Sequence, residues 1–449
     1  MRNSPRWAAA VVSILALGAI AASACTGRAS PIGWAGARPV EIGSRDVVLV
    51  PHKAKLYSLK PMSATPNWIF PPKDKASYPL SEDASSRIKD LIDATSLEST
   101  AKKELEQRVD DVRLAGETGD ALNDAIDASL ATPGEKEDIQ RVVDDAVEFE
   151  ADALKNLKAI YGDLGVSDDG GTVYFTTFRG ILFALDTDTG TARWIRDAGD
   201  QIVGGVAVDG DTIFFGTKGK KLHAVDARSG ERIWDFEAGG EVWATPAIVG
   251  ESLYITSLDG AVYSIDKATG TQQWAFTGAS SGIAASPVVA DGVLYVGAFD
   301  NRLYALNAAD GTMKWSIKAD NWFWAKPVVA DGIVYAASLD GKVYAVRADD
   351  GSDAWAKPFD TGAPVRSSPV KAGNGLVVAA RNARLYRLSL ETGEQTEGSP
   401  LDLEGESKVE ADLALAGGDL VYLVPRSRAV WIFEAETGLR SLGGFPLPN

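Results

Sequence analysis

The stretch "LYALNAADGTMKW", from Leu303 to Trp315, decides the fold because versions of it recur along most of the chain. It has the pattern of an apolar strand, a turn containing Asp-Gly, and a second strand that carries a Trp. From Trp194 onward the Trp-to-Trp spacings are 40, 40, 41 and 40 residues. Copies carry this Trp at Trp68, Trp194, Trp234, Trp274, Trp315 and Trp355, and weaker copies without it begin at Leu385 and Val430. A fixed period of this length predicts a repeat architecture.

The full repeat, as in "SPVVADGVLYVGAFDNRLYALNAADGTMKWSIKA" (Ser286 to Ala319), holds four short strand segments separated by turns rich in Gly, Asp and Asn. Four strands per repeat predict the blades of an all-β propeller, and the eight copies predict an eight-bladed ring. Seven blades are the alternative if the first or last copy is not a true blade. We place the first blade at residues 38–81 and blades two to eight at residues 161–449.

The repeated Trp is predicted to be structural and to wedge between neighbouring blades. Burying one Trp removes on the order of 200 Å² from water, worth roughly 5 kcal/mol before entropy is subtracted. The turn before it ends in a Gly, as at Gly270 and Gly311, which is predicted to take the left-handed conformation. The Asp that opens several of these turns, such as Asp266, is predicted to hydrogen-bond the turn backbone.

An acidic segment at residues 82–160 interrupts the repeat after the first blade. Its apolar residues recur at helical spacing, and it holds 21 Asp and Glu against 10 Lys and Arg. "TSLE" (Thr95 to Glu98) and "TPGE" (Thr132 to Glu135) are typical of capping boxes at helix N-termini. We predict three or four helices, which form either a self-contained bundle beside the ring or an arm that docks a partner.

The N-terminus has the pattern of an export signal over residues 1–25, with Arg2 and Arg6 before an apolar run from Trp7 to Ala22. Cys25 is the only cysteine and follows that run directly. "ASAC" fits either ordinary signal cleavage or a bacterial lipobox, in which Cys25 is lipidated and becomes the mature N-terminus. Residues 26–37 are predicted to be a flexible linker.

The strand segments just before a repeated Pro are predicted to lead to the central channel mouth. Aligned on Pro246, Pro287, Pro327 and Pro369, they read "EVWAT", "GIAAS", "WFWAK" and "PVRSS". The variable positions give a candidate binding surface rich in Trp with basic neighbours, a composition favoured at binding sites; its residues are Glu241, Trp243, Thr245, Trp322, Trp324, Lys326, Arg366 and Ser368. The alternative is that these side chains only fill the channel.

The composition excludes several other classes of function. A net charge of −17 argues against a nucleic-acid-binding surface, which would be basic. The sequence shows no phosphate-binding glycine loop, nucleophile elbow or zinc-ligand spacing. His223 takes the aromatic position of its repeat, so we predict a packed strand residue rather than a ligand. We assign no catalytic, cofactor-binding or metal-binding residue.

The repeated "ALDxxTGxxxW" motif resembles the pyrroloquinoline-quinone-like β-propeller repeat family, and within it the BamB-like envelope lipoproteins, which are not enzymes. The resemblance covers the chain from about Val40 to the C-terminus, apart from the helical insertion. Quinone-dependent dehydrogenases of this family hold the quinone beside two adjacent cysteines and a calcium ion. With Cys25 as the single cysteine, that pair cannot exist here.

The resemblance implies a protein-binding scaffold of the cell envelope that takes part in outer-membrane or envelope protein assembly. We expect a monomeric ring, exported and held by an N-terminal lipid anchor at the periplasmic or extracellular face, with protein partners and no cofactor. The alternative function is a quinone-dependent dehydrogenase-like enzyme or a small-ligand sensor that uses the central channel.

Overall fold

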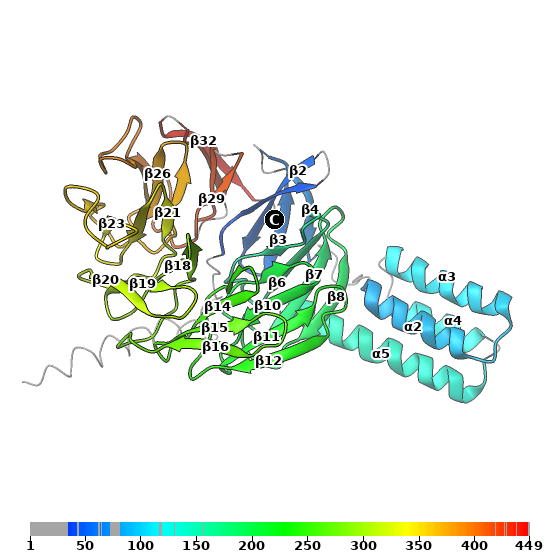
Figure 1. The fold of residues 1–449 in the computed structure, drawn as a ribbon. Helices are drawn as coiled ribbons and strands as arrows, with labels where there is room; N and C mark the ends of the chain where they lie inside the picture. Colours follow the sequence, from blue (N-terminus) through cyan, green and yellow to red (C-terminus); the bar gives the residue numbers. More distant parts are fainter. Residues whose placement is uncertain are drawn as a thin grey trace, which may run out of the picture.

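Eight four-stranded antiparallel sheets form a ring, and a helical bundle projects from one side of it (Figure 1). This computed structural model describes residues 35–42, 45–61, 63, 65–71, 81–115, 119–129, 131–155, 157–417, 419–425, 427, 429–436 and 438–447. The predicted eight-bladed propeller is confirmed, and seven blades are excluded. The predicted export signal, Cys25 and most of the predicted linker lie outside the described residues.

Within every blade the strands pair in chain order, so each blade is an antiparallel meander. Blades 1 to 4 consist of β1 (Arg38–Ile42), β2 (Arg45–His52), β3 (Lys55–Leu59), β4 (Pro66–Phe70); β5 (Gly165–Val166), β6 (Thr172–Thr176), β7 (Ile181–Asp186), β8 (Ala192–Asp197); β9 (Ala207–Asp209), β10 (Thr212–Gly216), β11 (Lys221–Asp226), β12 (Arg232–Glu237); and β13 (Ala247–Val249), β14 (Ser252–Thr256), β15 (Val262–Asp266), β16 (Gln272–Phe276). Blades 5 to 8 consist of β17 (Val288–Ala290), β18 (Val293–Gly297), β19 (Arg302–Asn307), β20 (Met313–Lys318); β21 (Val328–Ala330), β22 (Ile333–Ala337), β23 (Lys342–Arg347), β24 (Phe359–Asp360); β25 (Val370–Ala372), β26 (Gly375–Ala380), β27 (Arg384–Ser389), β28 (Leu401–Asp402); and β29 (Ala414–Ala416), β30 (Leu420–Leu423), β31 (Ala429–Glu434), β32 (Arg440–Pro446).

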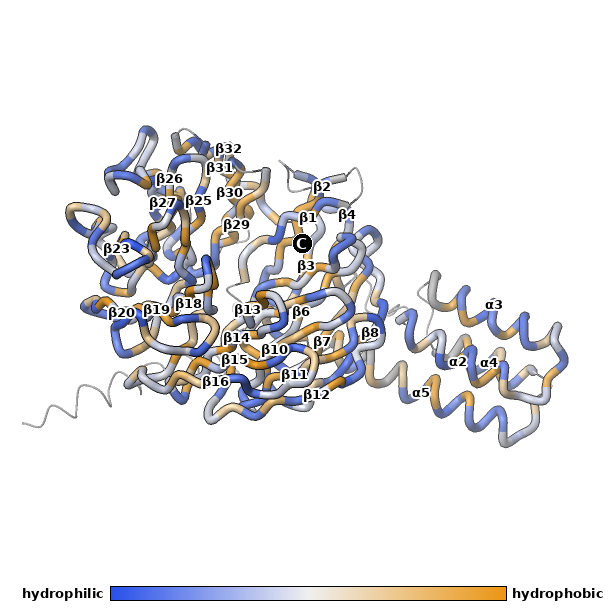
Figure 2. The backbone as a smooth tube through the Cα atoms, in the orientation of Figure 1, coloured by the Kyte–Doolittle hydropathy of each residue, from blue (hydrophilic) through white to orange (hydrophobic). Residues whose placement is uncertain are grey.

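The hydrophobic core of the ring is divided into eight clusters, one for each seam between neighbouring blades. One cluster joins blades 8 and 1, with Val48 and Tyr57 packed against Tyr422 and Ile432. Since blade 1 comes wholly from the N-terminal part of the ring and blade 8 wholly from the C-terminal part, the ring closes by side-chain packing rather than by a shared sheet. Figure 2 shows the hydrophobic positions concentrated on the strands.

Each repeat Trp crosses a seam to the next blade. Its indole Nε1 donates a hydrogen bond of 2.8–3.2 Å to a carbonyl in the turn of that blade; the pairs are Trp68–Thr187, Trp194–Ala227, Trp234–Lys267, Trp274–Ala308, Trp315–Ala348 and Trp355–Leu390. The ring of the indole lies on the Gly of the same turn. At Gly270, which has a φ of +71°, an added Cβ would lie 2.6 Å from the Trp234 ring. The Gly therefore meets two demands at once, a left-handed backbone and space for the indole of the preceding blade.

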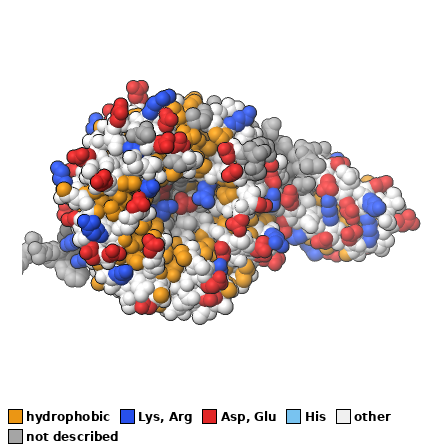
Figure 3. Space-filling model, turned by 45° about the horizontal axis from the view of Figure 1, so that its top comes forward, with side chains coloured by type: hydrophobic (Ala, Val, Ile, Leu, Met, Phe, Trp, Pro, Cys, Tyr) orange, Lys and Arg blue, Asp and Glu red, His pale blue; other side chains and the backbone are white. Residues whose placement is uncertain are grey.

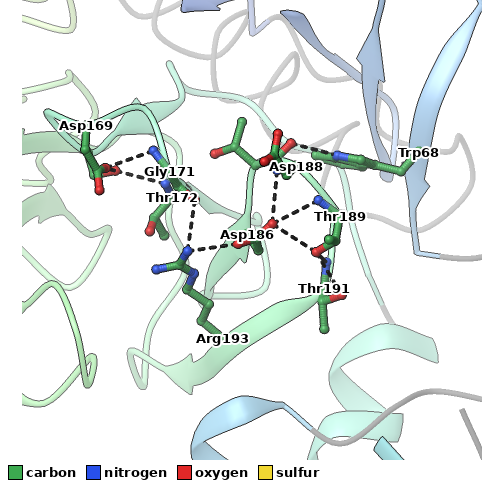
Figure 4. Close-up of polar contacts among 11 residues, drawn as sticks. Trp68, Asp169, Gly171, Thr172, Asp186, Asp188, Thr189, Thr191 and Arg193 are labelled. Atoms are coloured by element: carbon green, nitrogen blue, oxygen red, sulfur yellow. Dashed lines mark hydrogen bonds and ion pairs between the residues drawn. The ribbon is translucent and has the colours of Figure 1, made fainter. Parts of the chain in front are cut away.

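The turn that receives Trp68 shows how the repeated Asp organises the hairpin (Figure 4). The Asp186 Oδ1 accepts hydrogen bonds from the backbone N–H and the hydroxyl of Thr189, both at 2.9 Å. Arg193 donates from its guanidinium to the Asp186 Oδ2 at 2.9 Å and to the Gly171 carbonyl at 3.2 Å. These bonds lower the pKa of Asp186 against the opposing effect of burial, which is the largest single influence on it. The carboxylate thus serves the turn and is not directed at a ligand.

Arg387 takes the place of the missing Trp at the seam between blades 7 and 8. Its side chain is fully buried, and its Nε donates at 2.8 Å to the Ala435 carbonyl, which occupies the same turn position as the carbonyls that the Trp residues bind. The guanidinium also donates to the Asn374 Oδ1 at 2.7 Å, to the Thr396 Oγ1 at 3.1 Å and to the Glu436 carbonyl. A buried cation surrounded by carbonyl, amide and hydroxyl oxygens therefore provides this inter-blade lock.

The acidic insertion forms a four-helix bundle: α2 (Glu82–Ala94), α3 (Ser99–Ala115), α4 (Gly119–Ala128) and α5 (Pro133–Lys155). Each helix packs against the next, and α5 packs back on α2. Its apolar stripes close a separate core that includes Ile88, Ile92, Val109, Leu122, Ile126, Ile139 and Val143. The apolar faces of the four helices thus bury one another, as expected for a self-contained bundle.

One of the two predicted capping boxes is present and one is wrong. At the start of α5, the Thr132 hydroxyl and N–H donate to the Glu135 Oε2, and the Glu135 N–H donates to the Thr132 Oγ1. The bonds that the Glu135 carboxylate accepts, first from the Thr132 hydroxyl and then from the Thr132 and Ser96 N–H groups, lower its pKa to about 2. Thr95 instead caps the C-terminus of α2, because its hydroxyl bonds back to the Ile92 carbonyl at 2.6 Å. The next helix begins four residues later, at Ser99.

The bundle is fixed to blade 2 at its inner end. Asp83 of α2 pairs with Arg196 of β8 at 3.1 Å, and Asp152 of α5 pairs with Arg179 at 2.6 Å. The last turn of α5 contributes Leu154 to the hydrophobic seam between blades 1 and 2. Within the described part of the chain, no helix is long and apolar enough to cross a membrane.

Candidate binding site at the channel mouth

The segments that enter the innermost strands line a cavity on the ring axis. All eight blades contribute to it; the lining includes Ala35, Tyr161, Asp163, Gly205, Trp243, Thr245, Ser286, Trp324, Lys326, Arg366, Ser368, Glu410 and Asp412. The innermost strands follow one another around the axis in the order β5, β9, β13, β17, β21, β25, β29 and β1. The cavity holds about 70 Å³, space for a few water molecules.

A belt of hydrogen bonds runs around the cavity wall from blade to blade. The N–H of Gly205 donates to the Thr245 Oγ1, and the N–H of Thr245 donates to the Ser286 Oγ, both at 3.2 Å. On the other side, the N–H of Lys326 donates to the Ser368 Oγ at 3.1 Å, and the N–H of Ser368 donates to the Asp412 Oδ1 at 2.6 Å. Thr245 and Ser368 therefore hold the inner ends of neighbouring blades in register.

An aromatic stack stands above the belt at blades 5 to 7. Phe299 lies between Trp322 and Trp324, with ring centroids 4.6 Å and 5.3 Å away and interplanar angles of 28° and 20°. The Arg366 guanidinium lies 4.4 Å from the Trp324 ring centroid, within the range of a cation–π interaction. We call this set, Trp322, Phe299, Trp324 and Arg366, the mouth stack.

Basic side chains of blades 6 and 7 and acidic side chains of blades 8 and 2 line the mouth. Burial lowers the pKa of Arg366 to about 10, against the opposing effect of Glu410. Arg381 also pairs with Glu410 at 2.7 Å. Burial and the charge of Asp163 raise the pKa of Asp412 to about 6, although the hydrogen bond from Ser368 opposes the rise. Figure 3 shows Lys and Arg side chains beside the hollow at the centre of the ring.

The structure brings most of the predicted surface residues together. Six line the cavity: Trp243, Thr245, Trp324, Lys326, Arg366 and Ser368. Glu241 and Trp322 lie outside the lining, but each contacts a mouth residue. Glu241 accepts a hydrogen bond from the Trp243 Nε1 at 2.6 Å, and Trp322 belongs to the mouth stack.

Sequence reasoning missed Tyr161, Asp163, Glu410 and Asp412, which also line the cavity. Tyr161 and Asp163 of blade 2, and Glu410 and Asp412 of blade 8, are two pairs in which the residues are separated by one position. Each pair takes the repeat positions that Trp324 and Lys326 take in blade 6. The alignment on the repeated Pro could not find them because those two blades lack this Pro. Phe299 was also missed, because it lies in the loop between the second and third strands, where no repeat pattern singles it out.

His223 lies fully buried in blade 3, where its Nδ1 is 2.6 Å from the Asp235 Oδ1. Burial lowers its pKa, and the Asp235 carboxylate opposes that change. His223 also contacts Phe215, with ring centroids 5.2 Å apart. This residue is therefore placed inside the seam, away from the channel.

The donor set does not fit the quinone and calcium that the fold family implies. Calcium needs several converging oxygen ligands. Across the described ranges, no three His, Cys, Asp or Glu side chains are grouped to hold a metal ion. The one cysteine precludes an adjacent pair.

Comparisons with known proteins agree with this architecture. The sequence pattern of the family described as outer membrane protein assembly factor BamB matches residues 178–286 and 276–443, more than half of the chain. Among solved structures, BamB from Moraxella catarrhalis is similar with a TM-score of 0.53 and 22% identity, covering 61% of this chain and 82% of that one. The computationally designed Ika8 protein is similar with a TM-score of 0.49 and 15% identity, covering 63% and 83%. No curated protein sequence matches the chain.

Proposed function

Because the chain belongs to the family described as outer membrane protein assembly factor BamB, we propose that it is a non-enzymatic, exported and lipid-anchored scaffold that binds proteins in the cell envelope. The propeller fold supports a protein-binding role. Export and anchoring are supported by the N-terminal signal pattern and by the position of Cys25. A part in envelope protein assembly follows from the family.

The observation that carries the proposal is the channel mouth. It combines three Trp residues, Trp243, Trp322 and Trp324, with Arg366, and Trp and Arg are the residues most often found at the energetic centres of protein interfaces. Stacking and hydrogen bonds hold these side chains in place before any partner arrives, which lowers the entropic cost of binding. The mouth is also the face on which all eight blades converge.

Affinity purification of the full chain from native membranes, followed by mass spectrometry, tests the binding role. Envelope proteins are expected to co-purify, and a Trp243→Ala/Trp324→Ala variant is expected to lose them. Met313→Ala is the matched control, because Met313 is an exposed apolar side chain on an outer strand (55% exposed). Unchanged recovery with a folded double variant, or no enrichment of any envelope protein, would contradict the proposal.

Lipid anchoring is tested separately, through the mass of the mature protein. The lipidated protein is expected to begin at Cys25, to carry the added acyl mass and to partition into detergent. Cys25→Ser is expected to lack the acyl mass and to leave the membrane fraction. A mature wild-type N-terminus at Cys25 without acyl mass would support ordinary signal cleavage instead.

A further inference from the structure

The mouth stack ends in an aromatic face at Trp322. Phe299 covers one face of that indole. No second ring and no cation of the described residues stacks on Trp322. The side chain is half-buried, so part of it is open to solvent at the rim.

At the opposite end of the mouth stack, an indole face binds a cation. There the Arg366 guanidinium covers Trp324 at 4.4 Å from the ring centroid. The stack therefore runs from a guanidinium through Trp324 and Phe299 to Trp322. An indole face attracts cations through its quadrupole, and Trp is the strongest of the aromatic side chains in this respect.

The backbone of Trp322 is held firmly. Its carbonyl accepts a hydrogen bond from the Leu339 N–H at 2.8 Å and another from the Ser338 hydroxyl at 3.2 Å. Its N–H donates to the Asn321 Oδ1 at 2.8 Å. Little conformational freedom remains to be lost when a ligand stacks on the ring.

The rim beside Trp322 carries carboxylates on two neighbouring segments. Asp320 precedes Trp322 by two residues, and Asp340 follows Leu339, whose N–H donates to the Trp322 carbonyl. The Asp320 N–H donates to the Asp340 Oδ2 at 3.1 Å, which places these two segments together. Lys342 pairs with Asp320 at 2.8 Å, and the Asp320 side chain remains 80% exposed.

A Tyr hydroxyl fixes one of these carboxylates. Tyr344 donates to the Asp340 Oδ2 at 2.6 Å. Burial and this anionic acceptor raise the pKa of the Tyr344 hydroxyl. The Asp340 carboxylate is therefore held in place beside the Asp320 segment.

We propose that Trp322 and this acidic rim form a subsite for an arginine side chain of the partner. The inference rests on the proposed scaffold function and names the chemistry of its partner: an extended protein segment that places a guanidinium on Trp322 and its donors toward the Asp320 and Asp340 carboxylates. Arginine fits better than lysine because its planar guanidinium stacks on an indole while it donates to carboxylates at its edge.

N-acetyl-arginine amide is the probe, and ligand-observed saturation-transfer NMR with the full chain is the measurement. The signal is expected to saturate with concentration and to fall about five- to tenfold in Trp322→Leu, as expected for the loss of a cation–π contact with its electrostatic support. Met313→Ala is expected to keep the wild-type signal. N-acetyl-citrulline amide, which is planar and uncharged, is expected to give a signal at least about fivefold weaker.

An Asp320→Asn/Asp340→Asn variant provides a second test that leaves the stack intact. Its signal is expected to fall at least about threefold at low ionic strength. No saturable signal in the wild type, an unchanged signal in either variant, or equal binding of the citrulline probe would overturn the subsite.

These outcomes are distinct from failure of the scaffold function. If membrane purification recovers partners and the Trp243→Ala/Trp324→Ala variant loses them while the arginine probe fails, only the subsite is wrong. If the probe binds and no envelope protein is enriched, the scaffold function is wrong.

Discussion

Replacing Arg387 by Ala is expected to destabilise the propeller more than any single exposed change. Arg387 is 1% exposed and forms the lock between blades 7 and 8. Its removal leaves the Ala435 and Glu436 carbonyls and the Asn374 amide without this donor in a buried seam. Each buried polar group left unsatisfied costs roughly 1–3 kcal/mol, and the truncated side chain also leaves a cavity.

These losses are partly offset, because the substitution also removes the free-energy cost of burying a charged guanidinium. We expect a net decrease of about 3–5 kcal/mol in the free energy of unfolding, the range for breaking a buried charged contact. Arg387→Met fills much of the volume and is expected to cost less, about 2 kcal/mol, since it removes the hydrogen bonds but leaves a smaller cavity.

Urea unfolding followed by far-UV circular dichroism and by Trp fluorescence measures the change, with coincident transitions required before a free energy is extracted. Arg228→Ala is the matched control, because Arg228 pairs with Asp211 where both side chains are mostly exposed. That control is expected to cost less than about 1 kcal/mol. A loss below about 1 kcal/mol in Arg387→Ala would refute the lock.

Three further predictions concern the seams, the channel and the bundle. Gly270 has a φ of +71° and lies against the Trp234 ring, so Gly270→Ala is expected to lower the free energy of unfolding in urea by about 2–4 kcal/mol. The control Gly250→Ala, at a φ of +59° with open space around the added Cβ, is expected to cost about 1 kcal/mol. Because the pKa of Asp412 is raised to about 6, the native state binds more protons than the unfolded chain between about pH 4 and 6, so this carboxyl's contribution to stability falls as the pH rises through that window. Asp412→Asn is therefore expected to raise stability at pH 7 by about 1 kcal/mol, discounted for solvent at the mouth, with the gain gone at pH 4; an equal gain at both pH values would contradict the assignment. Replacing residues 86–148 by a short Gly-Ser linker is expected to leave a folded propeller with an unchanged melting temperature within a few degrees, since the bundle has its own core, and loss of the fold would show that the ring depends on it.

The repeat made the ring predictable from the sequence, because its period and turn residues recur in most of the blades. What could not be predicted is how positions in neighbouring blades combine. The sequence shows Trp234 and Gly270 as separate conserved-looking positions, whereas in the ring one lies on the other. In the sequence, Arg387 is one polar residue within the strand segment "LYRLS", and its part in a seam depends on a carbonyl 48 residues away.

The candidate site was predictable only where the repeat marked it. The Pro-aligned segments led to Trp243, Trp324 and Arg366, which line the cavity. Asp412 comes from a blade without that Pro, so no pattern pointed to it. Phe299 comes from a different loop, and only the three-dimensional stack reveals that it joins Trp322 to Trp324.

Site-specific photo-crosslinking in the native cell tests the central claim most directly. A photoreactive amino acid in place of Lys326 would sit at the mouth, where the side chain is exposed and only its backbone takes part in the hydrogen-bonded belt. The same amino acid in place of Met313 would sit on the outer strand β20. We predict a discrete adduct with an envelope protein from position 326 and none from position 313. Equal adducts from both positions, or none from position 326, would contradict a binding site at the channel mouth.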